Sequence, residues 1–427
     1  MAGTIKIALI GAGMFGSDVH LRAYANLQLA GIGAQLGRVG LGEWARDLAP
    51  IEFELVAVAA RSEESARRAA EQFKTWTGCA PKPYWGDKPW NDILHEARQL
   101  DVLAVATPDH LHTPVILAAL KAGVHVITEK PMCLDLAEAD QIIDLARTQN
   151  LVVAVDMHKR YDPDHLRICH DLKDRIGEPL YGVAYLEEPI ELPTHRFKWA
   201  AQSDPFTYVG PHWVDLICHY YRAKPLSLTA VGQKKRLVRE GIDAFDAVQV
   251  RVDFENGLSM HFHNNWITPT DFEGPVNQGH EIVGSEGKIE SDQQYRGLRW
   301  WAQDGGMHTA NTHFSREILG PAGARSWIGY GVDSLIAALA AICRVKYFQT
   351  PLQKVATVYP TADQARIVVA VIHAARLVRD LNFKYLLSGL GAPVSARFGP
   401  EGVTILDPTR VKEGPTAVLQ RVYSNPI

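Results

Sequence analysis

The sequence predicts two domains: an α/β domain with a parallel sheet, followed by a domain built on an antiparallel sheet. Short apolar runs at residues 5–10, 54–59, 102–106 and 125–128 alternate with helical stretches, which is typical of a parallel sheet covered by helices on both faces. From about residue 156 onward, strand-like runs joined by turn signals dominate. The 427 residues are also too many for one ordinary core. We expect domains over residues 1–155 and 156–398 and a C-terminal tail over 399–427.

The composition is that of a globular protein, with 47% apolar and 22% charged residues. A net charge of −4 gives no reason to expect nucleic acid or an anionic membrane as a partner. No apolar run approaches the roughly 18 residues of a membrane span, and MAGTIKIALIGAG resembles a first strand more than a signal peptide. The five cysteines lack the spacing of a metal or redox motif. We therefore expect a reduced, cytoplasmic setting and no metal.

A glycine-rich turn follows the first predicted strand. Residues 11–16 read GAGMFG and lead into the helical stretch SDVHLRAYANL. In the pattern G-x-G-x-x-G, the first glycine permits a tight turn, the second lets a pyrophosphate approach the backbone, and the third lets helix and strand pack closely. An ordinary strand-to-helix turn would give the same pattern. The position favours a dinucleotide site, and the residues expected to contact the cofactor are Gly11, Gly13, Met14, Phe15 and Gly16.

The second strand, residues 54–59, carries the signal for cofactor choice. An acidic residue that binds the ribose hydroxyls is expected roughly 20 residues after the glycines, but here the gap is about 50 residues. We attribute the excess to an insertion at about residues 28–50. The strand ends in Arg61 and Ser62 with no acid, and such a pair would hold a 2′-phosphate by charge-assisted hydrogen bonds. NADP is therefore favoured over NAD, although Ser62 could equally cap the next helix while Arg61 is solvated.

The next two strands also end in polar or restricted residues. Thr107, Pro108 and His112 follow the strand at 102–106, and Glu129 and Lys130 follow the strand at 125–128. Ligands of a parallel sheet bind outside the carboxyl ends of its strands. We therefore place these five residues at the cofactor, where an acid and a base beside each other are more plausible than in a core.

The second half reads as hairpins and two notable helices. Turn signals at 256–257 and 284–287 join alternating strands. Thr361 is the predicted N-cap of a helix over 361–381, with Gln364 completing a capping box.

The other notable helix begins after Gly210 and places His212, Asp215 and His219 on one face, because they are three and four residues apart. Three interpretations of this face are open: the residues carry out acid–base chemistry, they form a buried structural cluster, or they bind zinc. Acid–base chemistry is favoured, because no fourth zinc ligand is evident.

At this point the residues resemble a known family. GAGMFG, ATPDHLHTPVILAALKAGVHVITEKP and RYDP resemble the glucose–fructose oxidoreductase, inositol dehydrogenase and MocA family. The resemblance implies an N-terminal Rossmann domain and a C-terminal α+β domain with an open, mostly antiparallel sheet. It also implies that Lys130 lies in the active site and that a cis bond to Pro131 follows it. It places Asp215 and His219 opposite the nicotinamide, with His212 in support.

The expected function is hydride transfer between a nicotinamide cofactor and a secondary alcohol or ketone of a sugar, cyclitol or related polyol. His219 would take the hydroxyl proton, and Asp215 would orient His219 or hold a neighbouring hydroxyl. Lys130 would donate to the substrate oxygen. Arg160 follows the last strand of the first domain and would line the substrate site. The alternatives are a non-catalytic dinucleotide-binding regulator and a glycoside-cleaving enzyme that uses tightly bound cofactor for transient oxidation. We expect a homodimer or homotetramer.

Overall fold

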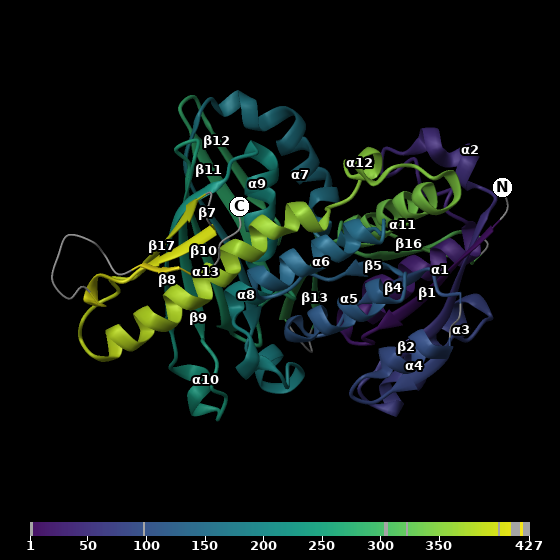
Figure 1. Cartoon of the computed structure of the whole chain (residues 1–427), viewed down its shortest axis with the longest axis horizontal. Coiled ribbons are helices and arrows are strands. Elements are labelled where there is room, and N and C mark those ends of the chain that lie inside the picture. Colours follow the sequence, from purple (N-terminus) through teal and green to yellow (C-terminus); the bar gives the residue numbers. More distant parts are fainter. Residues whose placement is uncertain are drawn as a thin grey trace. The chain divides into compact units, whose positions relative to one another are not determined.

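The computed structural model describes residues 3–96, 99–302, 306–321, 323–399, 402–410 and 419–421. The chain divides into two compact units (Figure 1). The first comprises residues 1–133, 138–163 and 313–365, and the second comprises residues 134–137, 164–312 and 366–427. This division differs from the predicted one, because residues 313–365 return to the first unit. They do so because the helix at 330–348 is apolar on nearly all sides and packs into the core of the first unit.

The first unit is built on a six-stranded sheet in the order β3-β2-β1-β4-β5-β6. All of its strand pairs are parallel, as the alternation of strands and helices predicted. The strands are β1 (Gly3–Ile10), β2 (Ile51–Ala60), β3 (Lys82–Trp85), β4 (Val102–Val105), β5 (His125–Thr128) and β6 (Val153–Val155). The sequence analysis gives no residue range for the short strands β3 and β6, although it expects a last strand before Arg160. Each is short, and β6 has too few residues to show a period.

Helices cover both faces of this sheet. The main core joins Ile5, Ile7 and Leu9 of β1 to buried side chains of the first helix and of the helix at 330–348. The helix at 112–121 packs against β4 and β5 outside this core cluster. The helices of the unit are α1 (Leu21–Ala30), α2 (Ala45–Leu48), α3 (Glu63–Thr77), α4 (Pro89–Glu96), α5 (His112–Lys121), α6 (Leu136–Thr148), which begins within the second unit, α11 (Tyr330–Phe348) and α12 (Leu352–Val355).

The glycine-rich stretch that we predicted as an insertion forms turns, a short 3₁₀ helix (Gly42–Trp44) and α2. Its apolar side chains enter the core of the first unit, where Ile32, Leu36 and Leu48 are fully buried. The segment is therefore a packed part of the domain.

The second unit contains a nine-stranded sheet in the order β12-β11-β7-β10-β9-β8-β17-β18-β19. Its pairs are antiparallel except for the parallel pair of β10 and β7. The strands are β7 (Pro179–Pro189), β8 (Pro225–Gln233), β9 (Ala247–Phe254), β10 (Ser259–Thr268), β11 (Asn277–Gly284), β12 (Lys288–Asp292), β17 (Ser395–Gly399), β18 (Gly402–Leu406) and β19 (Leu419–Arg421). Both predicted hairpins are present, at β9–β10 and β11–β12.

One face of this sheet is buried and the other is largely polar. On β10, Met260 and Phe262 are fully buried, whereas His261 and His263 are exposed. The buried face contacts α8 (Pro205–Val209), where Phe206 lies against Phe262. The other helices that begin or lie in this unit are α7 (Pro163–Arg167), α9 (Pro211–Tyr221), α10 (Arg236–Arg239) and α13 (Ala362–Leu387). The predicted alternation of inward apolar and outward polar residues is therefore confirmed.

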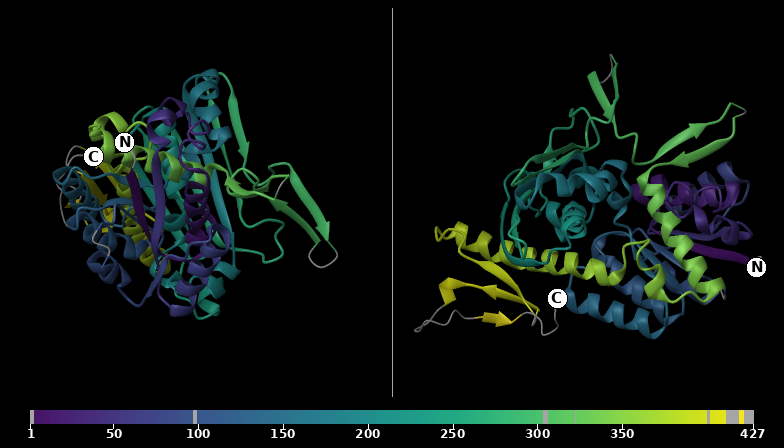
Figure 2. Two further views of the ribbon diagram at one scale, coloured as in Figure 1. Left: turned by 90° about the vertical axis from the view of Figure 1, so that its right-hand side faces the viewer. Right: turned by 90° about the horizontal axis from the view of Figure 1, so that it is seen from above.

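Two separate hairpins complete the described chain (Figure 2). One joins β13 (Leu298–Ala302) to β14 (Gly306–Ala310) in the second unit. The other joins β15 (Arg316–Leu319) to β16 (Arg325–Ile328) in the first unit. The second hairpin is tied to α1 by Asn26, whose side chain bonds both the N–H and the C=O of Trp327.

The predicted C-terminal tail over 399–427 is partly folded. Residues 402–406 form β18, which pairs with β17, and Val403 and Ile405 are buried. Only Thr404, which lies between them, is polar, so the sequence signal for this strand is weak. The rest of the predicted tail, at 411–418 and 422–427, lies outside the described residues. Across the described chain, no helix combines the length and apolarity needed to cross a membrane.

Candidate active site

The glycine turn closes tightly against the end of β4. Gly11 has φ +109°, and a Cβ there would lie 2.2 Å from the Ala106 carbonyl oxygen. A Cβ on Gly16 would lie 2.0 Å from the Gly11 carbonyl oxygen. By contrast, a Cβ on Gly13 would meet nothing within 4 Å. Two of the glycines are therefore required by the fold, and the middle one leaves open space next to the backbone.

The side chain of Thr107 fits a ligand at this turn. Its backbone nitrogen is one of the atoms nearest to Gly11. Its Oγ1 atom is buried and has no hydrogen-bond partner among the described residues. A buried hydroxyl without a partner costs free energy unless something binds it. The open turn and this hydroxyl together fit the phosphate or ribose oxygens of a dinucleotide.

The ends of β2 and β3 lie together beside the turn. Ser62 accepts a hydrogen bond from the Ser65 N–H at 3.3 Å and so caps α3. Arg61 is exposed, and no described residue bonds its guanidinium. Trp85, the last residue of β3, pairs with Ala60 and is 42% exposed. The capping role left open for Ser62 is thus present, and Arg61 stays available to an anion.

The predicted residues after β4 and β5 occupy different positions. Met14 in the glycine turn is exposed, and Pro108 begins the loop after β4. His112 is buried, and its ring lies between the carbonyl oxygens of Thr107 at 2.8 Å and Pro131 at 2.7 Å. It therefore ties the two strand ends together, and a cofactor contact by His112 remains a prediction. Lys130 is 7% exposed, and the bond that follows it is cis.

A buried polar chain lies beneath this edge of the sheet. The turn from Gly16 to His20 is a single π-helical turn, a feature that often occurs at functional sites. It places His20 in the interior, where Nδ1 lies 2.9 Å from the Tyr24 hydroxyl and Nε2 lies 2.9 Å from Glu129 Oε1. One atom from each of His20, Glu129 and Asp156 lies within 4.8 Å of the other two.

The environment sets the charges of these groups. Burial, opposed by the charge of Asp156, lowers the pKa of His20 to about 4, so its ring is neutral near pH 7. Burial and then the negative charge of Asp156 raise the pKa of Glu129 well above its usual value. Burial alone would raise the pKa of Asp156, but its interaction with His158, whose Nδ1 lies 3.4 Å from Asp156 Oδ2, holds this pKa below the usual value. Near pH 7 we therefore assign a proton to Glu129 and a negative charge to Asp156.

Aromatic rings enclose His158 at the end of β6. Its ring stacks on Phe15 at 5.2 Å and on Tyr330 of α11 at 5.5 Å, while Phe314 lies 5.3 Å away. Its Nδ1 lies 3.4 Å from Asp156. Phe15, predicted to touch the cofactor, is therefore also part of the wall that holds His158.

Helix α9 of the second unit carries the second group of predicted residues. The helix begins after Gly210 as expected. His212 and Asp215 are 4% and 1% exposed, whereas His219 near its end is partly exposed. From another face of the same helix, Trp213 donates from Nε1 to the Tyr185 carbonyl at 3.1 Å. This bond ties the helix to β7, and the roles of His212, Asp215 and His219 remain predictions.

Two further histidines adjoin this helix and were missed in the sequence. His165 accepts from or donates to the Tyr220 hydroxyl at 2.6 Å. The ring of His280 lies 5.3 Å from those of both His165 and Trp213. His280 lies on the buried face of β11. In the sequence, its position in the strand is the same as that of an ordinary core residue, so the pattern did not mark it as functional.

Arg160 takes part in the structure of the first unit. Its guanidinium donates to Gln364 Oε1 at 2.6 Å. The backbone N–H of Gln364 donates a hydrogen bond to Thr361 Oγ1 at 3.2 Å, which confirms Thr361 as the N-cap. The Gln364 side-chain oxygen, however, accepts from Arg160 rather than from the cap, because the arginine offers a charged donor. Substrate binding by Arg160 remains a prediction.

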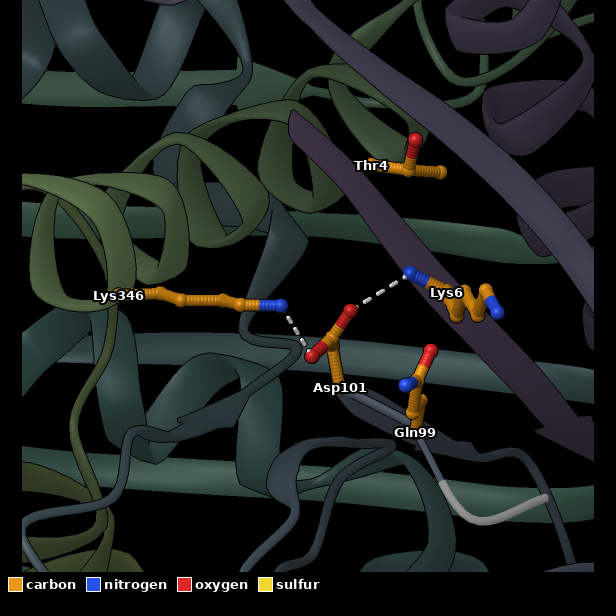
Figure 3. A pocket seen from close by; sticks show the side chains of 5 residues that line it. All are labelled: Thr4, Lys6, Gln99, Asp101 and Lys346. Carbon is orange, nitrogen blue, oxygen red and sulfur yellow. Dashed lines mark hydrogen bonds and ion pairs between the residues drawn. The ribbon is translucent and has the colours of Figure 1, made fainter. Parts of the chain in front are cut away.

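A hollow at the opposite edge of the first sheet is distinct from this site (Figure 3). It lies at the amino ends of β1 and β4, where Asp101 accepts from the Lys6 N–H at 2.9 Å and pairs with Lys346. Because the glycine turn follows the carboxyl end of β1, this hollow is not where a dinucleotide of this fold would bind.

The open glycine turn, the unpartnered hydroxyl and the parallel sheet define a dinucleotide-binding protein of the Rossmann class. The chain belongs to the GFO/IDH/MocA oxidoreductase family. Residues 5–157 match the model of the oxidoreductase family with an NAD-binding Rossmann fold. Residues 173–290 match the GFO/IDH/MocA C-terminal domain. The predicted family and fold class are confirmed.

Named relatives are similar over parts of their length. A 1,5-anhydro-D-fructose reductase of Ensifer adhaerens is 26% identical over 44% of this chain and 56% of that protein. An NADP-dependent scyllo-inositol 2-dehydrogenase of Bacillus subtilis is 26% identical over 50% of this chain and 60% of that protein. The chain therefore matches less than two thirds of the length of these relatives.

A solved structure shows the same fold. The scyllo-inositol dehydrogenase of Lactobacillus casei, solved with NAD(H) and scyllo-inositol, superposes with a TM-score of 0.62. The match covers 89% of this chain and 98% of that chain at 16% identity.

Replacing Gly13 by alanine should separate folding from cofactor binding. Because a Cβ at Gly13 meets nothing within 4 Å, the variant should fold with a melting temperature close to that of the wild type. Its methyl group would occupy the space through which a pyrophosphate approaches, so affinity for NADP and NAD should fall about tenfold or more, the worth of one charge-assisted hydrogen bond. Calorimetric titration measures the affinity. As a control, Gly16→Ala should melt earlier, and unchanged affinity of Gly13→Ala would contradict the assignment.

Proposed function

We propose that the protein is an oxidoreductase that transfers a hydride between a nicotinamide cofactor and a secondary alcohol or ketone of a sugar, cyclitol or related polyol. The observation that carries the proposal is the position of Lys130. It follows β5 at the same edge of the sheet as the open glycine turn, where the reacting end of a dinucleotide is expected in this fold. The names of the related reductase and dehydrogenase support the substrate class.

NADP is the favoured cofactor and NAD is the alternative. Arg61 and Ser62 stand where an acidic residue would bind the ribose hydroxyls of NAD, and an acid there would repel a 2′-phosphate. The exposed guanidinium of Arg61 has no described partner, so binding a phosphate would break no existing bond. The Bacillus subtilis relative is named as NADP-dependent, whereas the Lactobacillus casei enzyme was solved with NAD(H).

The nicotinamide ring supplies the hydride acceptor or donor when the cofactor is bound. In the direction of oxidation, His219 takes the substrate hydroxyl proton, and Asp215 orients the histidine or holds a neighbouring hydroxyl. Lys130 donates to the substrate oxygen and stabilises negative charge that develops there. His212 and Arg160 contribute substrate contacts. In reduction the same groups return the proton to the new hydroxyl.

Two alternatives have distinct signatures. A regulator that binds dinucleotide without turnover would show cofactor affinity and no activity on any polyol. An enzyme that oxidises its substrate transiently would purify with bound cofactor and recycle it without net consumption. Fluorescence of the purified protein, followed by a panel of inositols, anhydro-sugars and aldoses with NADP and NAD, separates the three functions. Steady consumption of added cofactor with one of these substrates supports the proposal, and its absence across the panel contradicts it.

Cofactor preference should depend on Arg61. Wild-type protein should bind NADP more tightly than NAD, and Arg61→Ala should lower NADP affinity roughly ten- to a hundredfold, because one charge-assisted contact is worth about 1.5–3 kcal/mol. NAD affinity should change little. Arg68→Ala is a matched control, since Arg68 lies nearby on α3, the helix that follows Arg61, in an exposed pair with Glu64. Equal binding of NAD and NADP by the wild type would refute the preference.

Lys130→Ala should lower turnover about a hundred- to a thousandfold, the usual effect of removing one electrostatic stabiliser of the transition state. Cofactor affinity should be nearly retained. Lys346→Ala serves as the control, because Lys346 lies at the opposite edge of the same sheet. Steady-state kinetics on the substrate found in the panel provide the measurement, and near-normal turnover of Lys130→Ala excludes this role.

The rate of alcohol oxidation should rise with pH as His219 loses its proton, because only the neutral imidazole accepts the hydroxyl proton. His219→Ala should remove this limb of the pH profile and lower turnover by about a hundred- to ten-thousandfold. His263→Ala, on the exposed face of β10, should keep the profile. If a folded His219→Ala protein keeps the same limb, another group accepts the proton. Loss of activity with a chelator, together with a stoichiometric metal, would favour a metal site on this helix.

A further inference from the structure

Two buried carboxyl groups lie close together at the ends of β5 and β6, and one of them, Glu129, directly precedes Lys130 in the sequence. Glu129 and Asp156 are 6% and 3% exposed, and their oxygens approach within 4.8 Å of each other and of His20. Two negative charges at this distance without solvent repel strongly, so one carboxyl must hold a proton or a cation must join them. The mechanism proposed above uses neither Asp156 nor His20.

Hydrogen bonds orient the carboxyl group of Glu129 within the pair. The backbone N–H of Glu129 donates to the Val105 carbonyl at 2.8 Å, which leaves its side chain to the interior. His20 is neutral, so it carries one N–H. If Nε2 donates to Glu129 Oε1, the other nitrogen accepts from the Tyr24 hydroxyl, and both 2.9 Å contacts are satisfied. Glu129 then has one oxygen occupied by His20 and one carboxyl edge facing Asp156.

Asp156 is fixed in the same way from its own strand. Its backbone N–H donates to the Thr128 carbonyl at 2.7 Å, which locks the end of β6 to the end of β5. The ring of His158, held between Phe15 and Tyr330, faces its carboxylate at 3.4 Å. The pair is therefore bounded by His20 and Tyr24 on one side and by His158 on the other.

Two cations act on the residues of this group: Lys130 acts on Glu129, and both Lys130 and Lys159 act on His158. The positive charge of Lys130 acts on the Glu129 carboxyl and on the His158 ring. Lys159 lies on the far side of His158, with its ammonium 6.0 Å from the Tyr330 ring, and its charge also acts on His158. These positive charges favour negative charge on the pair, whereas the burial of both carboxyl groups and their mutual repulsion oppose a second negative charge.

We propose that Glu129 and Asp156 form a buried pair that shares one proton and one negative charge, oriented by His20, and that this pair positions Lys130 and keeps its ammonium charged. Asp156 and His20 are then positioning residues for the reaction. This role for Lys130 rests on the proposed function, whereas the shared proton does not. The proton sits on the Glu129 side, and the negative charge sits on the Asp156 side.

The shared proton is tested by infrared spectroscopy of the whole protein at pH 7. A protonated buried carboxyl absorbs at the carbonyl frequency of an un-ionised acid and shifts in D₂O. The difference between wild type and Glu129→Gln should show the loss of this band, and the difference between wild type and Asp156→Asn should show the loss of a carboxylate band. Loss of the acid band in Asp156→Asn alone would put the proton on the wrong residue and overturn the assignment. A wild-type protein without any acid band at pH 7 would overturn it without the need for a variant.

A bound cation is the competing explanation, because one atom each of His20, Glu129 and Asp156 could hold a metal ion. Elemental analysis of the purified protein decides between them. A metal-free protein with the acid band supports the shared proton, whereas a stoichiometric metal replaces the proton and overturns the proposal.

The effect on Lys130 is measured by its reactivity with acetic anhydride as a function of pH, read by mass spectrometry. Loss of the negative charge in Asp156→Asn should lower the labelling midpoint of Lys130 by about one pH unit or more. Glu129→Gln keeps a neutral donor beside Asp156, so its midpoint should shift by less than half as much. Lys346, at the opposite edge of the sheet, provides the internal control in every sample. Equal midpoints in wild type and Asp156→Asn would refute the positioning role.

Each readout has a safeguard. Melting temperatures show which variants fold. If Asp156→Asn does not fold, the wild-type infrared band and the Glu129→Gln difference spectrum still decide the protonation state. In the labelling experiment, His20→Gln, which keeps a donor to Glu129, then replaces Asp156→Asn. A labelling midpoint of Lys130 in His20→Gln that equals the wild-type value would then overturn the orienting role of His20. None of these measurements uses substrate, so their failure and failure of the substrate panel are distinguishable.

Discussion

The close contact between the glycine turn and the end of β4 is the constraint on which this site depends. With the backbone of Gly11 against Ala106 and that of Gly16 against Gly11, the first helix must begin immediately above the carboxyl ends of the strands. The chain then has little room before α1, and it enters that helix through one π-helical turn. That turn carries His20 inward instead of toward solvent. The interior position of the histidine is thus a consequence of close backbone packing.

The same packing determines the electrostatics of the strand ends. Because β4, β5 and β6 continue to pair through the backbones of Glu129 and Asp156, both carboxyl groups are held where water does not reach. Burial raises the pKa of Glu129, while the approach of His158 to within 3.4 Å keeps that of Asp156 low. Two chemically similar side chains therefore differ in protonation because their neighbours differ. In the arrangement that we propose, Lys130 is adjacent to one negative charge rather than two.

The helices of the second unit are held in place mainly by apolar packing against its sheet. Its sheet buries one face, so the helices on that face are fixed by apolar contacts and by single bonds such as that from Trp213 to β7. Helix α9 can then hold Asp215 in the interior while His219, one turn later, remains partly exposed. A rigid helix with a polar face of this kind suits residues that must keep their orientation during proton transfer.

The sequence by itself determined the parts that have a local cause. Apolar runs and glycines defined β1, β4 and β5, the Asn256-Gly257 turn defined the β9–β10 hairpin, and the residues from the glycine turn to Glu129-Lys130-Pro131 defined the family. The short strand β6, the return of α11 to the first unit, and the group formed by His20, Asp156 and His158 required the tertiary structure. Residues 20, 129 and 156 are more than a hundred positions apart at their extremes, and no local period links them. Only the tertiary structure, in which the parallel sheet gathers the carboxyl ends of distant strands at one edge, brings polar atoms of these residues within 4.8 Å of one another and influences their charges.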